Sequence, residues 1–154
     1  MKHHKILLLL ANGFEILEAS AFIDVMGWNL EEGDKSTKLY SCGLRKQLNS
    51  AFDQQFTVDY IVKEVDIDSF DALVVPGGFK NYGYYNDAYS EEFLNIIRGF
   101  YSQNKTIASV CVGALPLGKS GVLENKTGTT YNNVEYREEL KKYGISLMDS
   151  SIVI

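Results

Sequence analysis

The chain has 154 residues, of which 45% are apolar and 23% charged, as is ordinary for one globular domain with its own core. The formal net charge of -5, without a basic stripe, argues against a nucleic-acid-binding protein. Two cysteines, Cys42 and Cys111, give no disulfide framework and fit a reducing compartment, so we expect a cytoplasmic protein. No spacing typical of metal ligands occurs, and we expect neither a metal nor a cofactor.

The first predicted element is the apolar run over residues 6–10. It follows a basic start, but it breaks at Asn12-Gly13 and is too short for a signal peptide or a membrane span. Its apolar character without alternation predicts a buried parallel strand. A helix over residues 17–31 follows, because Leu17, Ala21, Val25 and Trp28 recur at helical spacing before Gly33.

The remaining elements continue this alternation of strands and helices. A helix over 91–102 has Ser90 as a plausible cap. Alternating strands and helices predict an α/β fold with a mostly parallel sheet, in a single domain over residues 1–154. The other predicted elements are strands at 37–42, 45–50 and 56–60 (the last two able to form a hairpin), strands at 70–75 and 105–110, helices ending near 119 and over 133–143, and strands at 145–148 and 151–154.

Two further segments have unusual sequences. Residues 81–89 are rich in Tyr, Asn and Gly, which favours a surface loop, with a lid over a site as the alternative. Residues 151–154 end the chain on an apolar strand without a polar tail. We therefore expect the natural chain to continue past Ile154 with a further strand and helix.

Cys111 is the main candidate for chemistry. It follows the predicted strand at 105–110, with Ser109 two residues before it and Gly113 two after. This pattern of small residues around a nucleophile is typical of a nucleophile elbow. The turn would place the sulfur at a helix N-terminus, where free N–H groups favour a thiolate. By contrast, Cys42 lies inside a predicted strand and is interpreted as an inert core residue.

Other candidate residues follow two further predicted strands, and they would converge with Cys111 if these strands are neighbours. Parallel strands share their carboxyl ends, where sites form in open α/β sheets. Glu15 and Glu18 follow the first strand, and either could hydrogen-bond the sulfur as a protonated acid. Alternatively, they are simply acids in the first turn of a helix, where the helix dipole stabilises negative charge. Gly77 and Gly78 end the strand at 70–75, and Gly78 with the N–H of Val112 could form an oxyanion hole.

The chain has only two histidines, His3 and His4, both at the amino end of the first strand. A Cys-His pair, the usual arrangement in thiol proteases, is therefore not predicted. Phosphate binding after the first strand is also disfavoured, because Glu15 and Glu18 would repel it.

Four segments resemble the ThiJ/PfpI family, which includes the Parkinson-associated deglycase and PfpI-type proteases and belongs to the class I glutamine amidotransferase-like superfamily. The resemblance covers nearly the whole chain. Its segments are Gly13-Phe14-Glu15-Ile16-Leu17-Glu18 with Asp24-Val25-Met26, Asp71-Ala72-Leu73-Val74-Val75-Pro76-Gly77-Gly78, Ala108-Ser109-Val110-Cys111-Val112-Gly113, and Gly128-Thr129-Thr130-Tyr131.

The resemblance implies a flavodoxin-like three-layer sandwich and a homodimer. It assigns the reactive cysteine to Cys111, its partner carboxyl to Glu18, and backbone oxyanion donors to Gly78 and Val112. Family members often carry a histidine near the position of Tyr131, and this chain has none there. Tyr131 is therefore a secondary candidate, as is Glu15.

Two functions remain open. The first is a cysteine-dependent enzyme acting on small carbonyl electrophiles or their adducts, similar to a deglycase or glyoxalase. The second is a redox or stress sensor in which Cys111 oxidises to a sulfinic acid held by Glu18. A protease or amidase is less favoured, and the bland alternative is a vestigial site. Both active hypotheses predict a pKa of Cys111 below the roughly 8.5 of a free thiol. They also predict that the partner is a small-molecule substrate or oxidant, and that the protein binds neither a membrane nor a nucleic acid.

Overall fold

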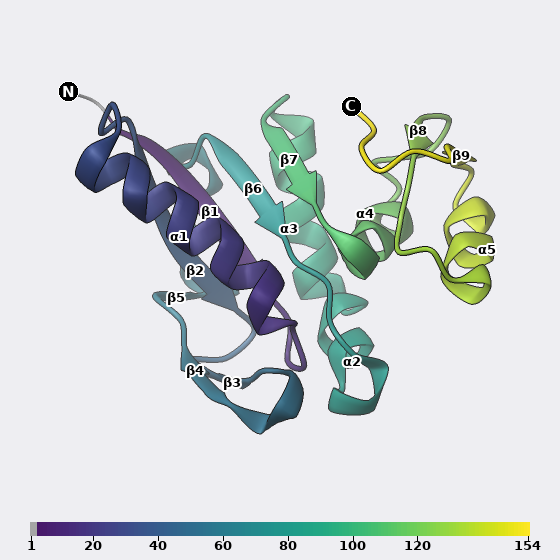
Figure 1. Cartoon of the computed structure of the whole chain (residues 1–154), viewed down its shortest axis with the longest axis horizontal. Coiled ribbons are helices and arrows are strands. Elements are labelled where there is room, and N and C mark those ends of the chain that lie inside the picture. Colours follow the sequence, from purple (N-terminus) through teal and green to yellow (C-terminus); the bar gives the residue numbers. More distant parts are fainter. Residues whose placement is uncertain (1–2) are drawn as a thin grey trace.

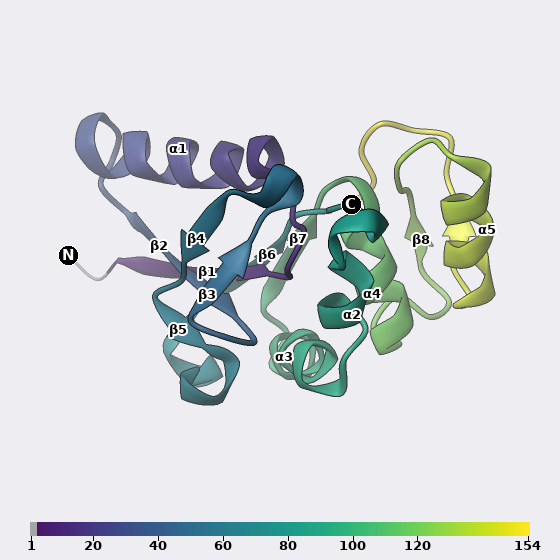
Figure 2. The same cartoon turned by 90° about the horizontal axis from the view of Figure 1, so that it is seen from below.

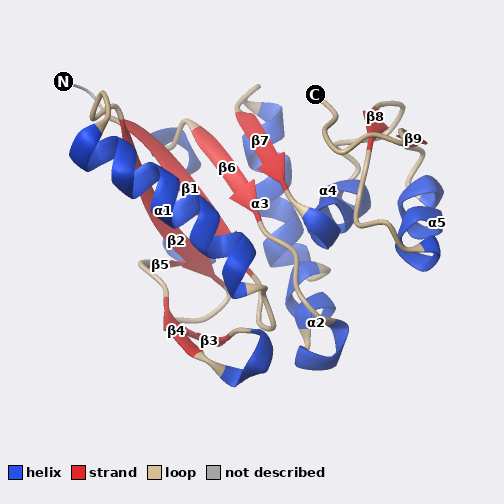
Figure 3. Ribbon diagram, viewed as in Figure 1, coloured by secondary structure: helices blue, strands red, loops and turns tan. Residues whose placement is uncertain are grey.

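A five-stranded sheet forms the centre of the computed structural model, which describes residues 3–154 (Figures 1 and 3). Every neighbouring pair of strands is parallel, which confirms the predicted sheet type. The strand order is β5-β2-β1-β6-β7. The strands are β1 (His4–Leu10), β2 (Thr37–Gly43), β5 (Tyr60–Ile61), β6 (Ala72–Val75) and β7 (Thr106–Ser109).

The first strand is central because both of its faces are apolar. Leu7 packs with α3 (Glu91–Ser102), whereas Leu8 packs with Phe14 and the inner side of α1 (Ile16–Glu32). Figure 2 shows α1 on one face of the sheet and α3 with α4 (Ala114–Ser120) on the other. This arrangement is the expected three-layer sandwich.

The predicted helix over 17–31 is confirmed as α1, but the residues used to predict it face away from the core. Leu17, Val25 and Trp28 are 77%, 63% and 62% exposed. The contacts with the sheet come instead from Ala19 and Phe22. The outer side of α1 therefore presents large apolar side chains to solvent.

Smaller elements complete the structure. The predicted hairpin is confirmed, since β3 (Gln47–Asn49) and β4 (Gln55–Thr57) pair antiparallel. Near the end of the chain, β8 (Thr127–Gly128) and β9 (Ser146–Leu147) form a separate parallel pair around α5 (Val134–Lys142). Short 3-10 turns occur at Ala51–Asp53, Val62–Glu64, Ile67–Ser69, Lys80–Tyr82 and Cys111–Gly113.

The prediction of a surface loop over 81–89 is wrong. This segment contains the short helix α2 (Tyr84–Ala88), and both Tyr84 and Ala88 are fully buried. Tyr84 is held inside because its hydroxyl donates a 2.8 Å hydrogen bond to the carbonyl of Pro76. Burial of a large aromatic ring with a satisfied hydroxyl outweighs the local preference for turns.

The prediction of a strand over 151–154 is also wrong. No strand occurs there, and Ile152 and Ile154 are exposed. A strand needs a neighbour to satisfy its backbone groups, and none of the strands within residues 3–154 pairs with this segment.

An ion pair between a buried carboxylate and a half-exposed guanidinium joins α2 to the loop after β2. The Asp87 side chain is 5% exposed, and it accepts two hydrogen bonds from Arg45, at 2.7 and 2.8 Å, and one from the N–H of Asn12. We expect Arg45→Met to lower the free energy of unfolding by about 1–3 kcal/mol, because it leaves a buried carboxylate without two of its hydrogen-bond donors. Urea denaturation measures this change.

A matched control is Lys63→Met, which removes an exposed pair with Glu92 at 3.5 Å. We expect a loss below about 1 kcal/mol, as for other surface pairs. Equal losses in the two variants would contradict the importance of burial at Asp87.

Candidate active site

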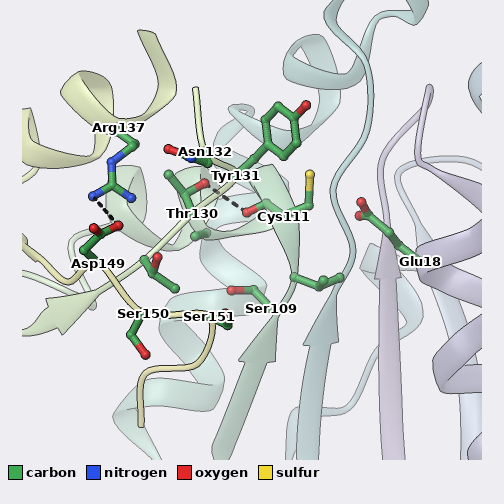
Figure 4. A pocket seen from close by; sticks show the side chains of 13 residues that line it. Glu18, Ser109, Cys111, Thr130, Tyr131, Asn132, Arg137, Asp149, Ser150 and Ser151 are labelled. Atoms are coloured by element: carbon green, nitrogen blue, oxygen red, sulfur yellow. Dashed lines mark hydrogen bonds and ion pairs between the residues drawn. The ribbon is translucent and has the colours of Figure 1, made fainter. Parts of the chain in front are cut away.

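Cys111 lies where β7 gives way to α4, so the strand-turn-helix of the predicted elbow is present. Its φ of 55° is in the left-handed region, which non-glycine residues seldom adopt. Figure 4 shows the sulfur pointing away from the sheet into the space between Tyr131 and Glu18. The strained turn thereby exposes the thiol to a cavity, as an elbow requires.

Glu18 reaches the site from the first turn of α1. Its Oε2 accepts a 2.7 Å hydrogen bond from the N–H of Gly77, which fixes the carboxyl. The carboxyl faces the Cys111 side of the cavity (Figure 4), and the two groups influence each other's pKa. The structure thus brings together the thiol and the carboxyl that the sequence proposed as partners.

The pKa of the thiol differs from our expectation. Burial raises the pKa of Cys111 to about 12, and the charge of Glu18 acts in the same direction, whereas a hydrogen bond from the Val112 N–H opposes them. Burial also raises the pKa of Glu18, although its bonds with Cys111 and Gly77 oppose this. Burial first, and the charge of Glu18 second, therefore act against the low thiol pKa that the sequence predicts.

The effect of the Glu18 charge gives a testable prediction. Glu18→Gln removes the negative charge, so the pKa of Cys111 falls and its alkylation midpoint moves to lower pH. Below the midpoint, the rate with iodoacetamide should rise about tenfold for each unit by which the pKa falls. Glu15→Gln is the control, since Glu15 has the smallest effect named for this thiol. An unchanged midpoint in Glu18→Gln would contradict the coupling.

The other predicted residues take separate positions. Glu15 caps α1, accepting a hydrogen bond from the Leu17 N–H at 3.2 Å, and so has a structural contact. Gly77 is not a free oxyanion donor, because its N–H is already donated to Glu18. Tyr131 is 56% exposed and lines the cavity beside Cys111. Gly78 pairs with Phe14 in an isolated bridge.

The cavity has a volume of about 540 Å³ and extends well beyond the cysteine. The sequence did not predict its far end, where Arg137 from α5 lies 4.0 Å from Asp149. It also missed Thr130, whose hydroxyl donates a 2.9 Å hydrogen bond to the Cys111 carbonyl and fixes the turn. The lining residues are Glu18, Ser109, Val110, Cys111, Ala114, Thr129, Thr130, Tyr131, Asn132, Arg137, Asp149, Ser150 and Ser151.

No histidine is among the described residues that line this cavity. Both histidines precede or begin β1, at the amino end of a strand whose carboxyl end leads to the site. Within residues 3–154, no group of three metal-binding side chains occurs, and no helix is long and apolar enough to span a membrane.

Comparison with known proteins identifies the family of the chain. The model of the DJ-1/PfpI family matches residues 4–154. The chain belongs to the DJ-1/PfpI family. A deglycase of Thermococcus kodakarensis is 31% identical over 151 residues, covering 97% of this chain and 84% of the relative.

Two further matches, one in sequence and one in structure, show how far the similarity extends. An uncharacterised protein of Methanocaldococcus jannaschii is 30% identical over 101 residues, covering 65% of this chain and 48% of the relative, so the match spans about half of that protein. The crystal structure of Drosophila melanogaster DJ-1beta has a TM-score of 0.81 and 25% identity, covering 99% of this chain and 77% of that one. The likeness confirms the flavodoxin-like fold.

Proposed function

We propose that the chain is a cysteine-dependent enzyme that converts small carbonyl electrophiles or their adducts, in the manner of a deglycase or glyoxalase. The observation that carries the proposal is the pairing of a thiol and a carboxyl, Cys111 and Glu18, across one cavity. The deglycase name of the Thermococcus kodakarensis relative is consistent with it.

The reaction can be written for methylglyoxal. The Cys111 sulfur adds to the aldehyde carbon while its proton passes through Glu18 to the carbonyl oxygen, giving a hemithioacetal. Glu18 then takes the proton from that carbon and returns one to the neighbouring carbon, while the hydroxyl proton moves to the former ketone oxygen, so the hemithioacetal isomerises to a thioester without an external oxidant. Water hydrolyses the thioester to lactate and restores the thiol. The N–H groups of Val112 and Gly78 are the proposed donors to the oxyanion.

The experiment is an assay of lactate release from methylglyoxal and from its adducts with N-acetylcysteine. Lactate formation above the buffer rate supports an enzyme. The absence of lactate contradicts one, provided that a parallel sample shows that Cys111 reacts with iodoacetamide under the same conditions. The protease and amidase alternative predicts instead the cleavage of a peptide or amide substrate, which the lack of an imidazole disfavours.

An alternative proposal is a redox sensor, favoured by the absence of histidine from the site. Two equivalents of peroxide would oxidise the thiolate to a sulfinate, releasing two waters, and Glu18 would donate a hydrogen bond to the new oxygen. Mass spectrometry after peroxide treatment tests this. A stable gain of two oxygens at Cys111, without lactate release in the other assay, favours the sensor.

We also propose a homodimer in the cytoplasm. The exposed apolar side of α1, with Leu17, Val25 and Trp28, supports an interface with a second copy. The two free cysteines support a reducing compartment. Analytical ultracentrifugation of wild type and Trp28→Glu tests the dimer, which we expect the substitution to weaken.

A further inference from the structure

The end of the cavity remote from Glu18 contains a cation that the proposed chemistry does not use. Arg137 is the one positively charged residue among those lining the cavity. Its side chain is 22% exposed, and its guanidinium donates no hydrogen bond within residues 3–154. A guanidinium that is partly shielded from water, and whose donors make no hydrogen bond to the described residues, is suited to a ligand with acceptor oxygens.

The current partner of Arg137 is weak. Asp149 lies at 4.0 Å, the limit of an ion pair, and its side chain is fully exposed to solvent. Such pairs contribute little free energy, so an incoming anion can replace Asp149. Figure 4 shows Arg137 turned toward Asp149, on the other side of Cys111 from Glu18.

Free hydroxyls also line the cavity. Thr129 and Ser151 line it, and within residues 3–154 their side chains make no hydrogen bond to the protein. Hydroxyls can donate to the oxygens of an anion held by arginine. The carboxyls of Glu18 and Asp149 would repel a doubly charged phosphate, whereas one arginine matches a single carboxylate.

We propose that Arg137, with Thr129 and Ser151, binds the carboxylate of the substrate, so that the preferred substrates are carbonyl adducts of small carboxylic acids, such as free amino-acid derivatives. The substrate would span the cavity, with its carboxylate at Arg137 and its carbonyl-derived carbon at Cys111. A volume of about 540 Å³ is sufficient for an adduct of this size. The binding of a carboxylate at Arg137 is independent of the proposed function, whereas the preference among substrates rests on it.

The first test measures binding without turnover. Iodoacetamide alkylation of Cys111 is followed in the presence of N-acetylalanine or N-acetylalaninamide, which differ only in the carboxylate. We expect the acid to slow alkylation at a concentration at least about tenfold lower than the amide, as one charge-assisted interaction predicts. Equal protection by both, or none by the acid, would overturn the subsite.

Matched variants identify the residue. Arg137→Gln should abolish the preference for the acid, whereas Lys142→Gln, which removes a charge from the exposed end of α5, should retain it. Asp149→Asn should strengthen protection by the acid, because it removes the competing carboxylate. A preference that survives in Arg137→Gln, or weakens in Asp149→Asn, contradicts the assignment.

The second test compares turnover of the methylglyoxal adducts of N-acetylcysteine and N-acetylcysteinamide. We expect kcat/KM to favour the acid by about tenfold or more, and Arg137→Gln to remove this advantage. Equal kcat/KM values for the two adducts overturn the proposed specificity for carboxylates but are compatible with the proposed enzymatic function. Turnover of neither adduct contradicts the proposed function, and the protection experiment then decides the subsite alone.

Discussion

Cys111→Ser lowers the rate of lactate release from methylglyoxal adducts by at least about a thousandfold if the proposed chemistry is correct. A hydroxyl at this position is a far weaker nucleophile than sulfur, and no histidine lines the cavity to activate it. The variant preserves the size of the side chain, so the cavity and the contact of Glu18 with Gly77 should persist. Steady-state kinetics measures the loss, and circular dichroism verifies the fold.

Cys42→Ala is the control for this experiment. Cys42 is fully buried in β2, and burial raises its pKa to about 12, so it should take no part in the reaction. We expect kcat/KM to change by less than about twofold at a small cost in stability. Comparable activity losses in the two cysteine variants would contradict a specific role for Cys111.

Gly113→Ala should destabilise the protein by about 2–3 kcal/mol. A Cβ there would lie 2.4 Å from the carbonyl oxygen of Val75 and 3.1 Å from that of Pro76. Both contacts involve backbone atoms, which cannot rotate away, so β6 or the turn at Cys111 must move. We therefore expect a lower midpoint in urea denaturation and a large loss of activity together.

Gly27→Ala is the matched control, because a Cβ at Gly27 meets no atom within 4 Å. Gly27 lies inside α1, where alanine is favoured over glycine by about 0.5–1 kcal/mol. This variant should be slightly more stable than wild type. If Gly113→Ala were as stable as Gly27→Ala, the close approach of the elbow to β6 would not be needed.

The parts of the fold that the sequence predicted share a strong local signal. The apolar run at 6–10 is buried on both faces, and Ser90 caps α3 by accepting a hydrogen bond from Phe93. Residues 81–89 were mispredicted because their turn-forming composition conceals Tyr84, whose burial depends on a distant carbonyl at Pro76. A tertiary contact of this kind leaves no periodic pattern in the sequence.

The site shows the same division. Cys111 follows β7, and Glu18 lies on the helix that follows β1. The carboxyl ends of these parallel strands lie at the same edge of the sheet, so the meeting of the two residues could be predicted from topology and resemblance. The raised pKa of Cys111 could not, because it depends on how deeply the pair is buried. Arg137 was missed since it lies on α5, outside the five-stranded sheet, and approaches the cavity only through the packing of the last elements.

The central claim is that Glu18 carries the proton for Cys111, in place of an imidazole. The most direct measurement is the kcat of Glu18→Gln for lactate release, taken alongside its iodoacetamide alkylation rate. The account predicts that kcat falls by at least about a hundredfold, as for loss of a general acid-base, while alkylation of Cys111 becomes faster. A Glu18→Gln variant that retains the wild-type kcat would contradict the account. So would a variant in which kcat and the alkylation rate of Cys111 fall together, because the thiol itself would then have lost its reactivity.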